Sequence, residues 1–164
     1  MEAGKPKVLL IGGGPQYWSC SAMYLRRCGC DCQFAFSYQE TRWLVGAQGF
    51  DLVLSLLRLQ DGSAFPLIRL LEGSSATLFF CLSVEDGCWW LPALRCGLNS
   101  FGSSALRPRD FVAALEEAIE QIRLRLKRRK RRTAVSSVTA QSRRSRVTAG
   151  AGAAQKKTVI LSTF

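Results

Sequence analysis

One stretch of the chain, Asp51–Gly62, constrains the fold more than any other. Its first half, Leu52–Leu57, is apolar except for Ser55. An uncharged apolar run of this length is typical of a strand that is buried on both faces. Strands of this kind occur in parallel sheets that carry helices on both sides. The stretch therefore predicts an α/β fold with this strand at its centre.

Shorter patterns on either side of this strand predict the other elements. The further strands are expected at residues 7–11, 30–36, 77–82 and 99–102. Helices are expected at residues 15–27, at 39–47, from a Ser63 cap to Gly73, at 85–94, and from Arg107 onward. Short connections between alternating strands and helices predict a flavodoxin-like, five-stranded parallel sheet of order 2-1-3-4-5, covered by five helices.

Three of these helices lead to specific side-chain expectations. In the helix at 39–47, Trp43 and Leu44 are expected to face inward. In the helix at 85–94, Trp89 and Trp90 are adjacent, so both cannot face the core and at least one ring should be exposed. The helix from Arg107 has the clearest period of 3.6 residues, and its apolar stripe is Phe111, Leu115, Ala118, Ile119 and Ile122.

Charge divides the chain into two parts. Residues 1–122 contain 10 Lys and Arg against 12 Asp and Glu, whereas residues 123–164 contain the other 13 basic residues and no acid. Beyond Leu126 few large apolar side chains remain to offset the entropy of ordering. We expect a folded domain at residues 1–126 and a basic, largely disordered tail at residues 127–164.

The seven cysteines are an odd number and follow no secretory leader, which favours a reducing, cytoplasmic location over a disulfide framework. No apolar run is long enough for a membrane span. Cys28, Cys30 and Cys32 have the wrong spacing for a zinc site, and the chain has no His. They are expected to pack as small hydrophobes, and no metal or cofactor is predicted.

Two segments, Asp51–Gly62 and Gly97–Phe111, together resemble the response-regulator receiver family. Asp51–Gly62 is similar to the family's Asp-Leu-Val-Leu-Leu-Asp strand, which runs into a loop closed by Asp-Gly. Gly97–Phe111 is similar, without a gap, to Gly-Ala-Asp-Asp-Tyr-Leu-x-Lys-Pro-Phe-x-Pro-Arg-Glu-Leu. The resemblance covers about residues 6–122. It implies the receiver fold and a role in signal transduction, as in two-component systems.

The residues with which receivers take up a phosphoryl group are missing from this sequence. Gly12 and Gly13 stand where the resemblance places the acidic pair that holds Mg²⁺. Leu56, or Leu54 when the loop is counted back from Asp61, stands at the phosphoacceptor, and Ser104 replaces the lysine. Phosphoryl transfer needs a carboxylate neutralised by metal and a nearby cation. A degenerate receiver that is not an enzyme is therefore expected.

The resemblance also implies positions for conformational switching. Phe101 aligns with the switch aromatic, and the switch hydroxyl falls on Leu82 by ungapped counting or on Ser83 with one deletion. In receivers the face of the fourth helix, fifth strand and fifth helix docks partners or a second copy. Trp89 and Trp90 would lie on or near that face, either as partner contacts or as cover for the sheet edge.

Two alternatives stay open. Gly12–Gly14 after the first strand also suggests a Rossmann-like nucleotide-binding protein or enzyme, although Tyr17 stands where a G-x-G-x-x-G register needs glycine. The six consecutive cations Lys127, Arg128, Arg129, Lys130, Arg131 and Arg132 favour binding to nucleic acid, to another anionic surface, or only solubility. The preferred function is a phosphorylation-independent interaction module with a polycationic tail.

Overall fold

The fold is built on one six-stranded sheet. The computed structural model describes residues 4–84, 87–95, 98–99 and 105–151. The strands of the sheet are β1 (Lys7–Ile11), β2 (Asp31–Ala35), β3 (Leu52–Leu56), β6 (Thr77–Val84), β7 (Gly87–Arg95) and β8 (Leu98–Asn99). Their order is β2-β1-β3-β6-β7-β8. The first four are parallel, which confirms the expected order 2-1-3-4 for that part of the sheet.

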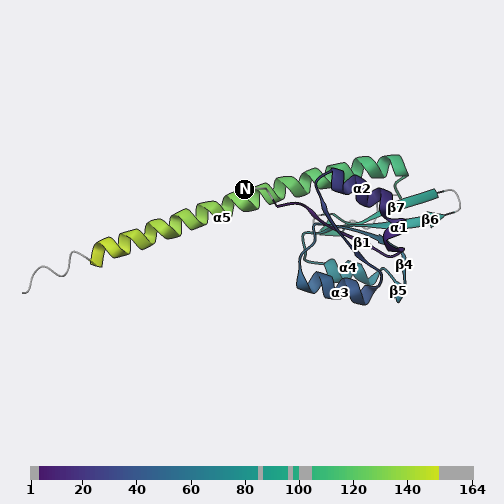
Figure 1. The fold of residues 1–164 in the computed structure, drawn as a ribbon, viewed down its shortest axis with the longest axis horizontal. Coiled ribbons are helices and arrows are strands. Elements are labelled where there is room, and N and C mark those ends of the chain that lie inside the picture. Colours follow the sequence, from purple (N-terminus) through teal and green to yellow (C-terminus); the bar gives the residue numbers. More distant parts are fainter. Residues whose placement is uncertain (1–3, 85–86, 96–97, 100–104, 152–164) are drawn as a thin grey trace, which may run out of the picture. The chain divides into compact units, whose positions relative to one another are not determined.

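Helices cover both faces of this sheet (Figure 1). They are α1 (Gly14–Tyr17), α2 (Ser19–Arg27), α3 (Tyr38–Ala47), α4 (Pro66–Leu71) and α5 (Pro108–Ala151). The helix expected at 15–27 is thus divided at Trp18 into α1 and α2. A hairpin of β4 (Arg58–Leu59) and β5 (Gly62–Ser63) follows the central strand.

Successive side chains of each strand point to opposite faces of the sheet, which produces two apolar layers. Leu52 and Leu54 of β3 belong to the layer under α2 and the first part of α5, together with the predicted stripe of α5. Val53 points to the opposite face and joins the layer under α3 and α4. All three are at most 1% exposed. The prediction of a central strand buried on both faces is confirmed.

The helix predicted at residues 85–94 is wrong in the described part of that range. Residues 87–95 form β7, which pairs antiparallel with β6 and places Cys81 beside Trp90 and Leu82 beside Trp89. The fifth strand of the sheet is therefore antiparallel to its neighbour β6. A strand thus lies where the fourth helix of the expected docking surface was predicted. The aromatic residues of Cys88–Leu91 suit a pleated surface, and a direct hairpin with β6 satisfies their backbone groups.

Two further expectations are corrected. Trp43 on α3 is 72% exposed rather than inward-facing, whereas Leu44 packs against the core beneath α3. α5 continues to Ala151, so residues 127–151 are helical over more turns than the one or two expected beyond Leu126. The physical reason is that Arg, Lys, Ala and Gln have high helix propensity and this segment extends a helix that has already been nucleated.

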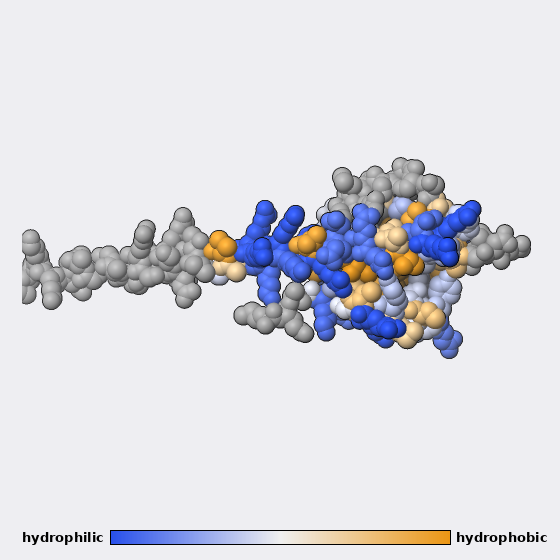
Figure 2. Space-filling model, turned by 90° about the horizontal axis from the view of Figure 1, so that it is seen from above, coloured by the Kyte–Doolittle hydropathy of each residue, from blue (hydrophilic) through white to orange (hydrophobic). Residues whose placement is uncertain are grey.

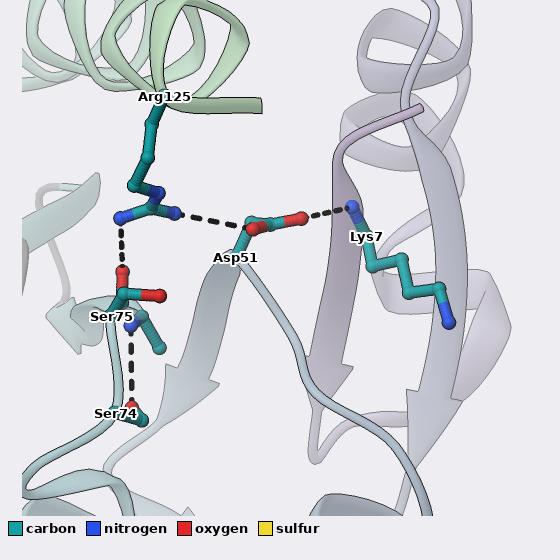
Figure 3. A network of polar contacts seen from close by, with 6 residues as sticks. Lys7, Asp51, Ser74, Ser75 and Arg125 are labelled. Carbon is teal, nitrogen blue, oxygen red and sulfur yellow. Dashed lines mark hydrogen bonds and ion pairs between the residues drawn. The ribbon is translucent and has the colours of Figure 1, made fainter. Parts of the chain in front are cut away.

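A polar network holds α5 to the amino end of β3 (Figure 3). The guanidinium of Arg125 donates to Asp51 Oδ1 at 3.1 Å and to the Ser75 carbonyl at 2.6 Å. The other Asp51 oxygen accepts from the Lys7 backbone N–H at 3.0 Å. The guanidinium of Arg123, on the same part of α5, donates a hydrogen bond to the Cys28 carbonyl. Polar contacts thus extend to the last turn before Leu126.

The chain separates into two compact units, Met1–Leu126 and Lys127–Phe164. The first contains the sheet and its helices, and the second contains the basic part of α5. Among the described residues, no helix combines the length and the apolar character that a membrane span needs.

Candidate functional site at the carboxyl ends of the strands

The turn after β1 lies at the carboxyl end of the parallel strands, where the resemblance places a metal-binding acidic pair. Gly12 and Gly13 have φ values of 86° and 65°, in the left-handed region that favours glycine. The Gly12 N–H donates to the Ala35 carbonyl at 2.8 Å, and the Trp18 indole N–H donates to the Gly12 carbonyl at 2.6 Å. Hydrogen bonds on both sides therefore fix the turn.

Neighbouring side chains crowd the position that a Cβ atom would take at either glycine of this turn. A Cβ atom on Gly12 would lie 3.2 Å from Leu56 Cβ and 3.2 Å from Leu59 Cδ2. A Cβ on Gly13 would lie 2.9 Å from the Tyr17 ring and 3.0 Å from Leu56 Cδ1. Leu56 thus occupies the end of the central strand and packs directly against both glycines.

Replacing Gly12 with Asp is expected to lower the free energy of unfolding by about 2–5 kcal/mol, the sum of left-handed strain and overpacking. Gly46→Ala is the matched control, because Gly46 lies inside α3 with nothing within 4 Å of its Cβ position. This substitution should raise stability by about 0.5–1 kcal/mol. Urea denaturation of both variants measures the effect, and an unchanged stability of Gly12→Asp would contradict the described packing.

Tyr17, Cys81 and Cys88 gather beside Leu56. Leu56 and Cys81 are register neighbours on β3 and β6. The Tyr17 hydroxyl lies 3.4 Å from Cys81 Sγ and 3.9 Å from Cys88 Sγ. Burial is the main cause that raises the pKa of Cys81 to about 11, and burial likewise raises the pKa of Tyr17. Both groups are thus neutral at physiological pH.

Sequence reasoning did not single out this cluster. Tyr17 is separated from the cysteines by more than sixty residues, so only the sheet brings them together. The available signal was the placement of Cys81 and Cys88 on two strands that form a hairpin. That signal was lost because residues 85–94 were expected to be helical.

The positions expected to act as a switch are only partly described. Leu82 and Ser83 lie on β6, opposite Trp89 and Cys88 respectively. Phe101 and Ser104 lie outside the described residues. The structure therefore brings together Gly12, Gly13 and Leu56 of the predicted degenerate pocket.

The two tryptophans have different environments. Trp90 is 7% exposed and stacks on Phe111, with ring centroids 3.8 Å apart and an angle of 5° between the rings. Its backbone also pairs with Leu106 in both directions. Trp89 is half-buried, and the Arg107 guanidinium lies 5.7 Å from its ring centroid. Trp90 is therefore a core residue, and only Trp89 stays a candidate for partner contact.

The basic run forms part of α5. All six side chains from Lys127 to Arg132 are exposed, and Figure 2 colours this stretch of the helix as hydrophilic. Successive residues of a helix point about 100° apart, so six consecutive cations surround the helix axis completely. This arrangement presents positive charge in every direction rather than as one stripe.

Cys28, Cys30 and Cys32 have a structural environment. Cys30 and Cys32 are buried in the layer under α2 and α5, and Cys28 packs against that layer. Burial raises the pKa of the Cys30 thiol to about 11. In the described parts of the chain, no group of three or more His, Cys, Asp or Glu side chains could hold a metal ion. A four-ligand zinc site is thus absent from those parts.

Comparison with known proteins finds matches to this chain among solved structures. No protein-family model and no curated protein matches the sequence. The signal receiver domain of an HD domain-containing protein from Pseudomonas fluorescens Pf-5 has a TM-score of 0.54 and 18% identity. It covers 76% of this chain and 93% of its own.

Two further receiver structures are similar at the same level. The non-phosphorylated HemR receiver domain from Leptospira biflexa has a TM-score of 0.51 and 22% identity, and covers 70% of this chain and 94% of its own. The beryllofluoride-activated NtrC4 receiver domain dimer has a TM-score of 0.51 and 15% identity, and covers 71% of this chain and 98% of its own. At these identities the likeness concerns the fold. The chain has the α/β fold of response-regulator receiver domains.

Proposed function

We propose that the protein is a receiver-like regulatory module that acts through protein–protein contacts and takes up no phosphoryl group. The observation that carries this proposal is the packing of Leu56 and Tyr17 against Gly12 and Gly13. Mg²⁺ prefers oxygen ligands in octahedral geometry, and receivers need an acidic pair and an acceptor carboxylate to supply them. At the positions that the resemblance matches to these ligands, the chain has Gly12, Gly13 and Leu56, and none of them carries a carboxylate.

The same packing disfavours the nucleotide-binding alternative. A glycine-rich turn binds a pyrophosphate when its backbone N–H groups can approach the ligand closely. Here Leu56, Leu59 and Tyr17 lie against the turn, and α1 after it has only 4 residues. The contacts at this turn therefore support an interaction module over a small nucleotide-binding enzyme.

Two surfaces are proposed to carry interactions, and the protein is proposed to act in the cytoplasm. The half-buried ring of Trp89, with Arg107 above it, is a candidate contact for a protein partner or a second copy. The basic segment of α5 is proposed to bind nucleic acid through phosphate contacts. Its support is six exposed cations with no acid anywhere in residues 123–164.

Phosphoryl chemistry provides the test of the main proposal. Incubation with Mg²⁺ and beryllofluoride, or with acetyl phosphate, is expected to leave the melting temperature and the intact mass unchanged. Ligand binding to the native state would raise the melting temperature. A receiver domain with its acidic residues intact, treated in parallel, is the positive control.

Leu56→Asp is the matched variant for this test. It restores a carboxylate at the acceptor position but leaves Gly12 and Gly13 unable to hold the metal, so we expect it to stay unmodified as well. A stoichiometric phospho-adduct on the unaltered protein that hydroxylamine removes would refute the proposal.

A further inference from the structure

We propose that Cys81 and Cys88, with the Tyr17 hydroxyl beside both sulfurs, form a binding site for a single soft, two-coordinate metal ion such as Cu(I). The site lies beside Leu56, at the end of the sheet where receivers hold their phosphoryl group. It is distinct from the proposed nucleic-acid contact on α5, and Trp89, the proposed partner contact, lies on the opposite face of β7 from Cys88.

Strand register places both thiols on one face of the β6–β7 hairpin. Cys88 pairs with Ser83, which lies two residues after Cys81 on β6. Residues two apart on a strand point to the same face, so Cys81 and Cys88 are diagonal neighbours. Both sulfurs lie within 4 Å of the same oxygen, the Tyr17 hydroxyl, at 3.4 and 3.9 Å. Two thiols therefore converge on one point.

Diagonal spacing favours an ion bridge over a disulfide. Diagonal neighbours in an antiparallel pair have Cα atoms about 7–8 Å apart. Disulfides usually need Cα atoms about 4.4–6.8 Å apart, so direct bonding would require the backbone to move. A bridging ion adds two metal–sulfur bonds of about 2.3 Å each, the length found in zinc thiolates, and so spans a wider gap.

The ligand set selects the kind of ion. Thiolates are soft ligands that favour ions such as Cu(I), whereas Mg²⁺ and Ca²⁺ require oxygen. The described residues contain no group of three or more metal-binding side chains, and the chain has no His. Within the described residues a tetrahedral zinc site therefore lacks ligands, and an ion that is satisfied by two thiolates fits the pair.

The surroundings of the two thiols suit a thiolate–metal unit and leave the site accessible to an ion from solvent. Cys81 is 2% exposed, and the Trp18 ring packs edge-on against Tyr17 at 5.0 Å between centroids. Tyr17 itself is 41% exposed, which leaves a side of the site in contact with solvent. Binding releases one proton from each thiol to solvent and changes no oxidation state. The Tyr17 O–H then donates a hydrogen bond to a thiolate.

Competition with a chromophoric Cu(I) chelator under anaerobic, reducing conditions tests the proposal on the full chain. We expect the unaltered protein to hold one tightly bound Cu(I). Cys88→Ser and Cys81→Ser should each weaken that ion by at least about 100-fold, as loss of a direct ligand exceeds the 10–100-fold effect of outer-shell partners. Tyr17→Phe should weaken it by about 10-fold.

Two control variants separate this site from the other thiols. Cys20→Ser removes an exposed thiol on α2, and Cys30→Ser removes a buried thiol of the core. Both should leave the tight Cu(I) unchanged. Circular dichroism verifies folding, and Cys88→Ser keeps the test valid if buried Cys81→Ser fails to fold, because Cys88 is half-buried.

Three results would overturn the proposal. The first is tight Cu(I) binding that survives in Cys88→Ser. The second is loss of that binding in Cys30→Ser with native folding retained. The third is a Cys81–Cys88 disulfide that forms in air without metal, since it would show that the sulfurs meet directly.

Discussion

Replacement of Trp90 with Ala is expected to lower the free energy of unfolding by about 3–5 kcal/mol, the usual range for removing a buried Trp. The ring is 7% exposed and lies between the Phe111 ring, stacked at 3.8 Å, and the Trp18 ring at 6.1 Å. Its removal leaves a cavity between β7 and the start of α5. Chemical denaturation measures the loss.

Trp89→Ala is the matched control for this substitution. Adjacent strand residues point to opposite faces, so Trp89 lies away from Phe111 and contacts Arg107 instead. Its cation–π contact is worth about 0.5–1 kcal/mol at an exposed site, and the loss of stability should be of that size. Equal destabilisation by the two variants would mean that β7 is not a strand with one buried face.

Removal of residues 127–164 is expected to abolish binding to duplex DNA while leaving the melting temperature of the remaining chain nearly unchanged. The apolar stripe of α5 ends with Ile122 and Leu126, and Arg125 still bonds Asp51 in the shortened chain. None of the buried side chains described in the sheet layers lies in the removed segment. The deletion therefore separates nucleic-acid binding from folding.

Substitution of all six residues from Lys127 to Arg132 by Gln provides the sharper comparison. Gln has a helix propensity similar to that of Lys and Arg, so α5 keeps its favourable composition while losing six positive charges. For the unaltered protein, six phosphate contacts predict a slope of about −5 in log affinity against log salt. Affinity should therefore fall about 10³-fold between about 50 and 200 mM salt.

Fluorescence anisotropy at several salt concentrations distinguishes the outcomes. We expect the Gln variant to lose nearly all of this salt-dependent affinity. Binding that is independent of salt, or that persists after deletion, would place recognition in residues 1–126 and refute the role of the basic segment. Binding to vesicles with anionic lipid but not to DNA would assign the segment to a membrane surface instead.

The sequence by itself determined the parts of this protein that depend on local pattern. The run Leu52–Leu56 predicted a central strand buried on both faces, because an uncharged apolar strand is stable only between two covered layers. The stripe from Phe111 to Ile122 predicted the buried face of α5, because residues three and four apart share one side of a helix. Both predictions are confirmed.

Tertiary structure alone decided the features in which distant segments meet. Residues 87–95 are a strand rather than a helix because β6 offers an antiparallel partner and Phe111 a stacking surface, and neither is visible from local composition. The packing of Leu56 against Gly12 and Gly13, and the meeting of Cys81 with Cys88, follow from strand register. Local periodicity predicts which face of an element is buried, whereas sheet register determines which side chains share a site.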